Sequence, residues 1–258
     1  MTTAVMCLPA PECARVGLAL AALRAAIGPI PPAWLRLPPA DNPAAPAGRF
    51  DANRFFGVFD RLAVAPGHTL DYVYNFSGNA GRPLLYTRRT GARPLATRAE
   101  HEQHASRVRS RPAFLDQVQL AAGDPVAALH LAWFALEAPK FYLHWHAQYF
   151  DDELVVLPGQ LKALLARIPA SASDPLEARR VIAEPARAAL RALDLQPRVA
   201  FGPDDASGEV TALAFGQWQG FHWRRTRFRR ERSWLRRDAL IIEHSVKVVA
   251  PYHCGIIF

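Results

Sequence analysis

Residues 221–237 limit how this chain can fold more than any other segment does, because they read FHWRRTRFRRERSWLRR. The segment holds eight arginines and one glutamate, a net charge of +7, while the other 241 residues together carry about +1. Successive side chains of a β-strand point to opposite faces, so arginines at adjacent positions would occupy both faces. Burying that many guanidinium groups is prohibitively unfavourable. We therefore expect this segment to project from the fold, to form a sheet edge, or to contact an anionic partner.

The remaining composition is that of a folded globular protein. The chain has 258 residues, of which half are hydrophobic. A chain of this length buries roughly 70–75% of its unfolded surface, so it can form a core without disulfides or metal. No apolar run reaches the roughly 18 residues that a membrane-spanning helix needs. The three cysteines are odd in number and widely spaced, which indicates reduced thiols and predicts a cytoplasmic protein.

The N-terminal region differs in composition from the rest of the chain. Apolar residues at helical spacing predict a helix over 11–27, which ends at a Gly-Pro pair. Seven prolines follow between residues 29 and 48, a density that neither a helix nor a central strand tolerates. We expect an N-terminal helix on a proline-rich tether, with residues 1–49 as an appendage and residues 50–258 as a single domain.

Periodicity and turn signals predict strands, then helices, then strands again along the main domain. This order lacks regular βαβ alternation, so it predicts an α+β fold with a central, mainly antiparallel sheet and helices packed on it. Strands that are apolar on both sides predict cover on both faces of that sheet. The expected strands are 70–76, 83–88, 114–120, 126–136, 141–148, 154–157, 198–201, 209–218, 221–232 and 239–249, and the expected helices are 97–110, 160–168 and 174–195, the last one kinked or split at Pro185.

The arginine-rich hairpin is the first candidate site. Arginines that contact phosphates, with interleaved aromatic side chains for base stacking, make up a single-strand nucleic-acid surface. An acidic protein partner or a membrane surface would satisfy the same charge. A cationic edge strand whose charge is paired internally would need no partner at all. The candidate binding residues are Trp223, Arg224, Arg225, Arg227, Arg229 and Arg230.

A pair of histidines is the second candidate site. On a strand His144 and His146 would share a face, and such a pair is a common half of a metal site. A catalytic zinc also needs a third protein ligand and an open position. The alternative is that both imidazoles are structural and packed among aromatic residues. Asp151, Asp152, His130 and His222 are the candidates for the third ligand.

Signatures of other chemistry are absent from the sequence. There is no nucleophile elbow, glycine-rich phosphate loop or dinucleotide fingerprint. No catalytic residue and no cofactor is therefore predicted.

Four stretches together resemble a family of uncharacterised bacterial proteins of similar length. They are LDYVY at 70–74, GRPLLY at 81–86, FYLHWHAQYFDD at 141–152 and PYHCGIIF at 251–258. The resemblance spans most of the chain after residue 60. It implies a single bacterial cytoplasmic domain and assigns no functional residue.

These observations favour a non-enzymatic cytoplasmic binding protein that engages an anionic partner, most concretely nucleic acid, through residues 221–237. A metal-dependent enzyme centred on His144 and His146 is the rival hypothesis. A third is a scaffold subunit of a bacterial protein complex, in which the N-terminal helix and its tether dock on another protein.

Overall fold

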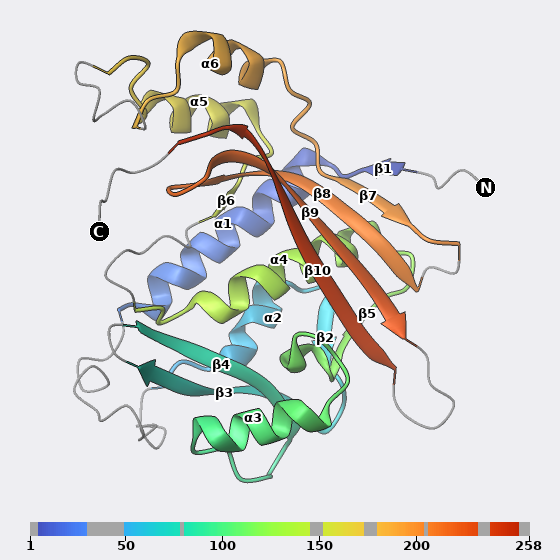
Figure 1. Ribbon diagram of the computed structural model, residues 1–258. Helices are drawn as coiled ribbons and strands as arrows, with labels where there is room; N and C mark the ends of the chain where they lie inside the picture. The colour runs from blue at the N-terminus through green and yellow to red at the C-terminus, as the bar shows by residue number, and fades with distance from the viewer. Residues whose placement is uncertain are drawn as a thin grey trace.

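The computed structural model describes residues 5–29, 49–77, 80–144, 152–172, 180–203, 206–231 and 238–252. Within this part of the chain the predicted α+β class is confirmed, with helices packed on a mainly antiparallel sheet (Figure 1). The main sheet has the strand order β1-β7-β8-β9-β10, and β6 pairs with one end of β8. Its strands are β1 (Val5–Cys7), β6 (Glu153–Leu154), β7 (Arg198–Phe201), β8 (Ser207–Gly216), β9 (Gly220–Glu231) and β10 (Ala239–Ala250).

Two smaller sheets and the helices complete the described architecture. Strand β3 (His68–Ser77) forms a hairpin with β4 (Ala80–Arg89), as the alternation predicted, and β2 (Leu62–Val64) pairs with β5 (Val118–Leu120). The helices are α1 (Ala10–Ile27), α2 (Phe55–Val58), α3 (Arg98–Arg107), α4 (Pro125–Glu137), α5 (Pro158–Ala166) and α6 (Glu184–Arg191), with short 3₁₀ turns η2 (Ala52–Arg54), η3 (Ala113–Leu115) and η4 (Ala138–Lys140).

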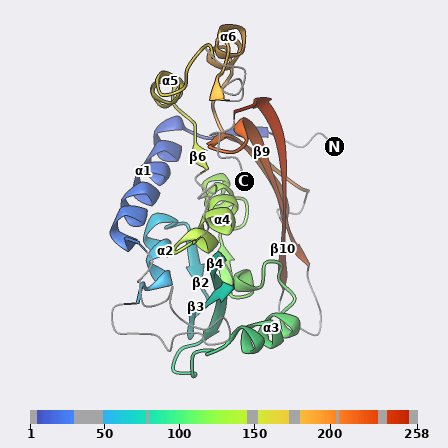
Figure 2. The ribbon, with the colours of Figure 1, turned by 60° about the vertical axis from the view of Figure 1, so that its left-hand side comes forward.

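Helix α4 is the centre of the fold and corrects the predicted strand 126–136. Asp124 caps its first turn by accepting hydrogen bonds from two backbone N–H groups, and Pro125 occupies the position where a missing N–H does no harm. Every residue from 127 to 135 is buried. A continuous apolar run cannot be assigned to helix or strand by periodicity, which explains the error. Figure 2 shows α4 between α1 and the main sheet.

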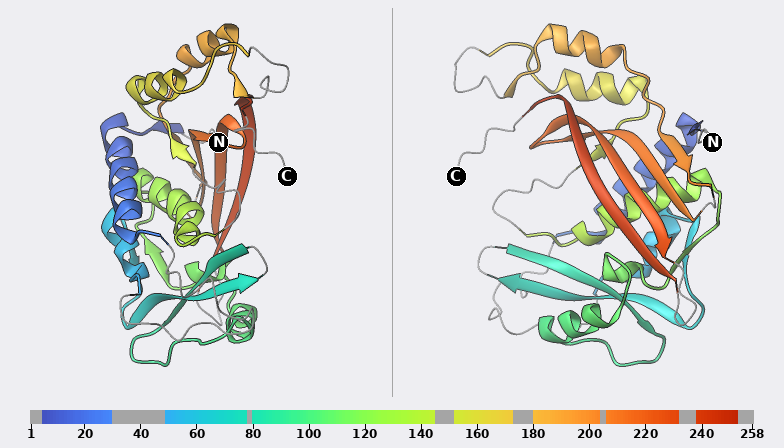
Figure 3. Two further views of the ribbon diagram at one scale, coloured as in Figure 1. Left: turned by 90° about the vertical axis from the view of Figure 1, so that its left-hand side faces the viewer. Right: turned by 45° about the vertical axis from the view of Figure 1, so that its right-hand side comes forward.

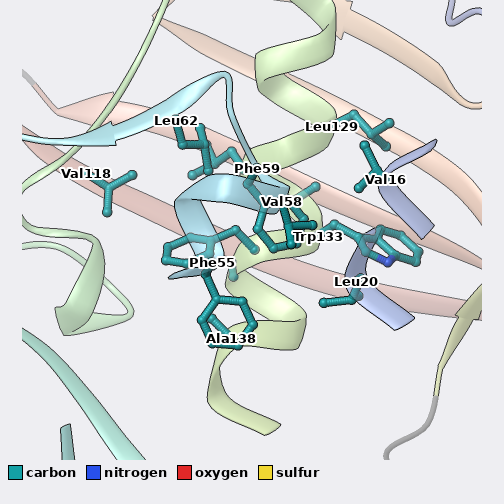
Figure 4. Close-up of a cluster of buried hydrophobic side chains, with 14 of the residues drawn as sticks. Val16, Leu20, Phe55, Val58, Phe59, Leu62, Val118, Leu129, Trp133 and Ala138 are labelled. Carbon is teal, nitrogen blue, oxygen red and sulfur yellow. The ribbon is translucent and has the colours of Figure 1, made fainter. Parts of the chain in front are cut away.

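The largest apolar core joins α1, α2 and α4 to one face of the main sheet, here called the inner face. Figure 4 shows Val16 and Leu20 of α1 near Leu129 and Trp133 of α4. Because β1 also pairs with β7, the first residues of the described chain pack with the main sheet. Residues 30–48 lie outside the described residues, so the proline-rich tether and the boundary at residue 49 stay predictions.

A second core covers only one end of the opposite face, here called the outer face. Leucines of α5 and α6 pack there against Leu213, Phe215 and Phe221. Figure 3 shows the two helices at that end of the sheet. The rest of the outer face is exposed, so the predicted cover on both faces holds for one end of the sheet. Helix α6 begins at Glu184 with Pro185 in its first turn, and the described residues 180–183 before it are not α-helical, so the proline starts a helix and does not kink one.

The turn between β8 and β9 supports a prediction about glycine. Gly220 has φ +77°, and an added Cβ would lie 2.2 Å from the Ala250 carbonyl oxygen. Gly91 has φ +82° with nothing within 4 Å of such a Cβ. Gly91→Ala is expected to lower the free energy of unfolding by about 1–2 kcal/mol through backbone strain alone. Gly220→Ala should lower it clearly more, because its Cβ would also overlap the Ala250 carbonyl oxygen. Urea denaturation of both variants measures the difference, and equal losses would contradict the turn geometry.

Candidate functional site

Strand β9 carries the arginine-rich segment through the interior of the main sheet. It pairs with β8 on one side and with β10 on the other, so it is not the edge strand that its charge suggested. Residues 232–237 of the segment lie outside the described residues. Alternation along the strand explains how the charge is accommodated: Arg225, Arg227 and Arg229 point to the uncovered outer face, with 51–61% of each side chain exposed.

Two glutamates lie among these three arginines, Glu209 on the neighbouring strand β8 and Glu231 at the end of β9 itself. Glu209 of β8 is directly opposite Arg227 and bridges two guanidinium groups, with Oε1 3.1 Å from Arg225 Nε and Oε2 2.8 Å from Arg227 Nε. Glu231 Oε1 lies 3.2 Å from Arg229 Nη2. Exposed pairs of this kind contribute little to stability and exchange readily with ions from solution.

Two of the three Phe and Trp side chains of β9 are buried and not available for base stacking. Phe221 is fully buried in the second core, and Phe228 is buried in the main core on the opposite face. Trp223 is half-buried and packs against the second core beside the exposed arginines. Phe221 and Phe228 therefore offer no stacking platform to the arginines of the outer face, and the binding role of Trp223 stays a prediction.

Arg224 and Arg230 point to the inner face, away from the other three arginines. The side chain of Arg224 is almost completely buried, and its Nη2 donates to Asp152 Oδ2 over 2.5 Å. Arg230 is half-buried. The structure thus brings together Arg225, Arg227 and Arg229 from the predicted set and separates them from Arg224 and Arg230.

Arg224 is the end of a chain of five alternating charges inside the protein. Arg24 donates to the fully buried Glu137, which also accepts from Lys140 Nζ at 2.8 Å. Lys140 Nζ lies 3.6 Å from Asp152 Oδ2, and Asp152 accepts from Arg224. A Cβ on residue 216 would lie 2.6 Å from Asp152 Oδ1, so glycine at that position lets the carboxylate approach the sheet.

Two histidines lie beside this chain of charges and stay neutral at pH 7. His222 Nδ1 is 2.9 Å from the Gly220 carbonyl oxygen and Nε2 is 3.5 Å from Arg224 Nη2, so Nδ1 carries the proton and Nε2 accepts. Burial lowers the pKa of His222. His244 lies at an exposed position of β10, where partial desolvation and the charges of Arg224 and Lys140 lower its pKa to about 4. His244 Nδ1 is 2.9 Å from Thr226 Oγ1.

The fold brings together only some of the residues proposed for a metal site. Asp152 Oδ1 and His222 Nε2 lie 4.0 Å apart, whereas His130 is buried on α4 against Phe59 and not on the strand expected for it. His144 is described, within a turn that makes a single bridge to Gly81, and His146 and Asp151 lie outside the described residues. No group of three or more His, Cys, Asp or Glu side chains in the described ranges could hold a metal ion.

The turn at 141–144 corrects the start of the predicted strand 141–148. Pro139 and Lys140 form a 3₁₀ turn, and Tyr142 has φ +51°, which is incompatible with an extended strand. Because His144 is not in a regular strand, the shared face expected for His144 and His146 does not follow from alternation. The metal site stays a prediction, which elemental analysis of the untagged protein tests.

Comparison with protein-family models, with curated proteins and with solved structures gives no match for this chain. The family resemblance therefore rests on the four sequence stretches alone and stays a prediction. Among the helices of the described ranges, none has the length and apolar character required to cross a membrane.

Proposed function

We propose that this protein binds nucleic acid through Arg225, Arg227 and Arg229 on the outer face of the main sheet. The observation that carries the proposal is their alignment on one exposed face of a central strand. Residues two apart on a strand are roughly 7 Å apart, so the three guanidinium groups form a row that can contact successive phosphates. No described helix covers this part of the sheet.

The surroundings of the row define what kind of binding is expected. Glu209 lies between Arg225 and Arg227, so a phosphate must compete with one carboxylate for two guanidinium groups. Phe221 and Phe228 are buried, so they add no stacking energy. Contacts to phosphate alone carry no sequence information, so binding should be weak and independent of base sequence.

Salt dependence gives the first test. Neutralising three phosphates of a single strand predicts a slope of about −2 for log affinity against log salt concentration. Replacing all three arginines in the variant R225Q/R227Q/R229Q is expected to abolish binding of a fluorescent oligo-dT in anisotropy titrations between 50 and 200 mM salt. Removing the competing carboxylate in Glu209→Gln should strengthen binding.

A matched control separates this surface from net charge. Arg98, Arg167 and Arg191 are 54–61% exposed, and each also pairs with one surface carboxylate. The variant R98Q/R167Q/R191Q loses the same charge and should keep binding. Equal loss in both triple variants, or no binding by the natural protein at 50 mM salt, would overturn the proposal. Binding of polyglutamate in place of oligo-dT would assign the row to an acidic protein.

A further inference from the structure

A cavity of about 840 Å³ lies between β4, α3, η3 and the end of α4, where β4 contacts η4. Its volume falls within the range of about 300–1,000 Å³ that is typical of small-molecule sites. Backbone hydrogen bonds hold one wall in place, because Gly81 and His144 exchange N–H and carbonyl groups at 2.7 and 2.8 Å. The cavity is separate from the arginine row on β9.

Most of the cavity wall is apolar. Leu84 and Leu85 of β4, Phe114 of η3 and Leu136 of α4 contribute to it, and Leu143 closes the side beyond η4. A wall of this kind favours a ligand with a hydrocarbon body, because apolar surface of both partners leaves water on binding.

The charged groups that line the cavity are all cationic. Arg82 and Lys140 are the cationic side chains that line it, His101 and His144 add two imidazoles, and none of the lining residues in the described ranges is Asp or Glu. Lys140 is already paired with Glu137 and Asp152. Arg82 is exposed and makes no ion pair with any residue of the described ranges, so no described carboxylate competes with a ligand for its charge.

We propose that this cavity binds a fatty-acid-like molecule, with its carboxylate at Arg82 and its hydrocarbon chain against the leucines and Phe114. An apolar wall with one available cation and no acid is complementary to an anionic head on an apolar body. A cationic amphiphile would place its charge beside Arg82, and an uncharged one would leave Arg82 without a partner. Selectivity for the negative head group is thus the property that identifies the site.

The test compares three probes that share a twelve-carbon chain, measured by isothermal titration calorimetry below their micelle concentrations. Dodecanoate is expected to bind about ten-fold more tightly than dodecanol, since a charged hydrogen-bond partner is gained, and dodecyltrimethylammonium more weakly still. Arg82→Gln should reduce the preference for dodecanoate over dodecanol to below about three-fold. Arg89→Gln removes the same charge on the same strand but outside the cavity. This control variant should retain the preference for dodecanoate over dodecanol.

Three further measurements distinguish binding in this cavity from binding elsewhere on the protein. Ala113→Phe, which places a ring into the cavity, should abolish dodecanoate binding while the circular dichroism spectrum stays native. The variant R225Q/R227Q/R229Q should bind dodecanoate like the natural protein, which keeps this proposal independent of the nucleic-acid surface. Equal affinity for the three probes, or binding to phosphatidylglycerol vesicles without binding to dodecanoate, would overturn the proposal.

Discussion

Asp152→Ala is expected to lower the free energy of unfolding by about 3–5 kcal/mol, because it leaves two buried cations without their shared carboxylate. Asp152 accepts from Arg224 and lies 3.6 Å from Lys140, and the three side chains are almost entirely buried. A buried charge that loses its partner keeps its desolvation cost and loses its compensation. Urea denaturation with a two-state fit measures the loss.

Two variants define what the result means. Glu153→Ala removes the neighbouring carboxylate, which makes an exposed pair with Arg167 at 3.4 Å, and should cost no more than about 1 kcal/mol. The double variant D152L/R224M replaces both charges with apolar side chains and should recover most of the lost stability. A loss below about 1 kcal/mol for Asp152→Ala would contradict the buried chain of charges.

Lowering the pH from 7 to 5 is expected to reduce the free energy of unfolding by up to about 2 kcal/mol for each of two fully buried histidines, His130 and His222. Burial lowers the pKa of both below the ordinary value of 6.5. The unfolded chain then takes up protons near pH 6.5 while the folded protein does not. The contribution of these two histidines to the free energy of unfolding is therefore fully present above pH 6.5. It is lost as the pH falls toward their lower pKa values in the folded state.

Glu137 acts in the opposite direction. Burial raises its pKa, so its contribution to stability is present below pH 4.5 and is lost as the pH rises through the pKa of the folded state. The net effect between pH 7 and pH 5 is still acid destabilisation, because the pKa values of His101, His104 and His244 are lowered as well, so five histidines oppose one carboxyl.

Replacing a histidine isolates its share of the pH dependence. In His222→Asn the side-chain amide can still donate to the Gly220 carbonyl, but it does not titrate. The slope of unfolding free energy against pH between 5 and 6.5 should fall by up to about 1.4 kcal/mol per pH unit. Denaturation series at several pH values measure both slopes. An unchanged slope in the variant would show that His222 takes up its proton equally in both states.

The C-terminal strands could be predicted from sequence because their information is local. Alternation and turn residues place 198–201, 209–218, 221–232 and 239–249 close to the observed strands β7 to β10. The strand predicted for 126–136 was wrong because α4 is buried on all sides. Its sequence therefore has no polar stripe that would reveal the helical period. The Asp-Pro start of α4 was a usable signal, since it supplies an N-cap followed by proline at the first position.

The site was predictable in composition but not in arrangement. The concentration of arginine in β9 is plain in the sequence. Which arginines are exposed depends on which face of the sheet α4 covers, and only the folded structure shows that. Glu209 reaches Arg225 and Arg227 through strand register, which only the folded sheet fixes. Glu137 carried a signal that was missed, because a single acid within the apolar run WFALEAP indicates a buried charge that needs cationic partners.

The chain of buried charges also bears on how this sequence can change over time. Arg24, Glu137, Lys140, Asp152 and Arg224 come from four separate parts of the chain, yet each depends on a neighbour for compensation. Loss of one charge makes the loss of its partner less harmful, so substitutions at these positions are coupled. Exposed pairs such as Arg167 and Glu153 contribute little to stability, so either residue can be substituted without a change in its partner.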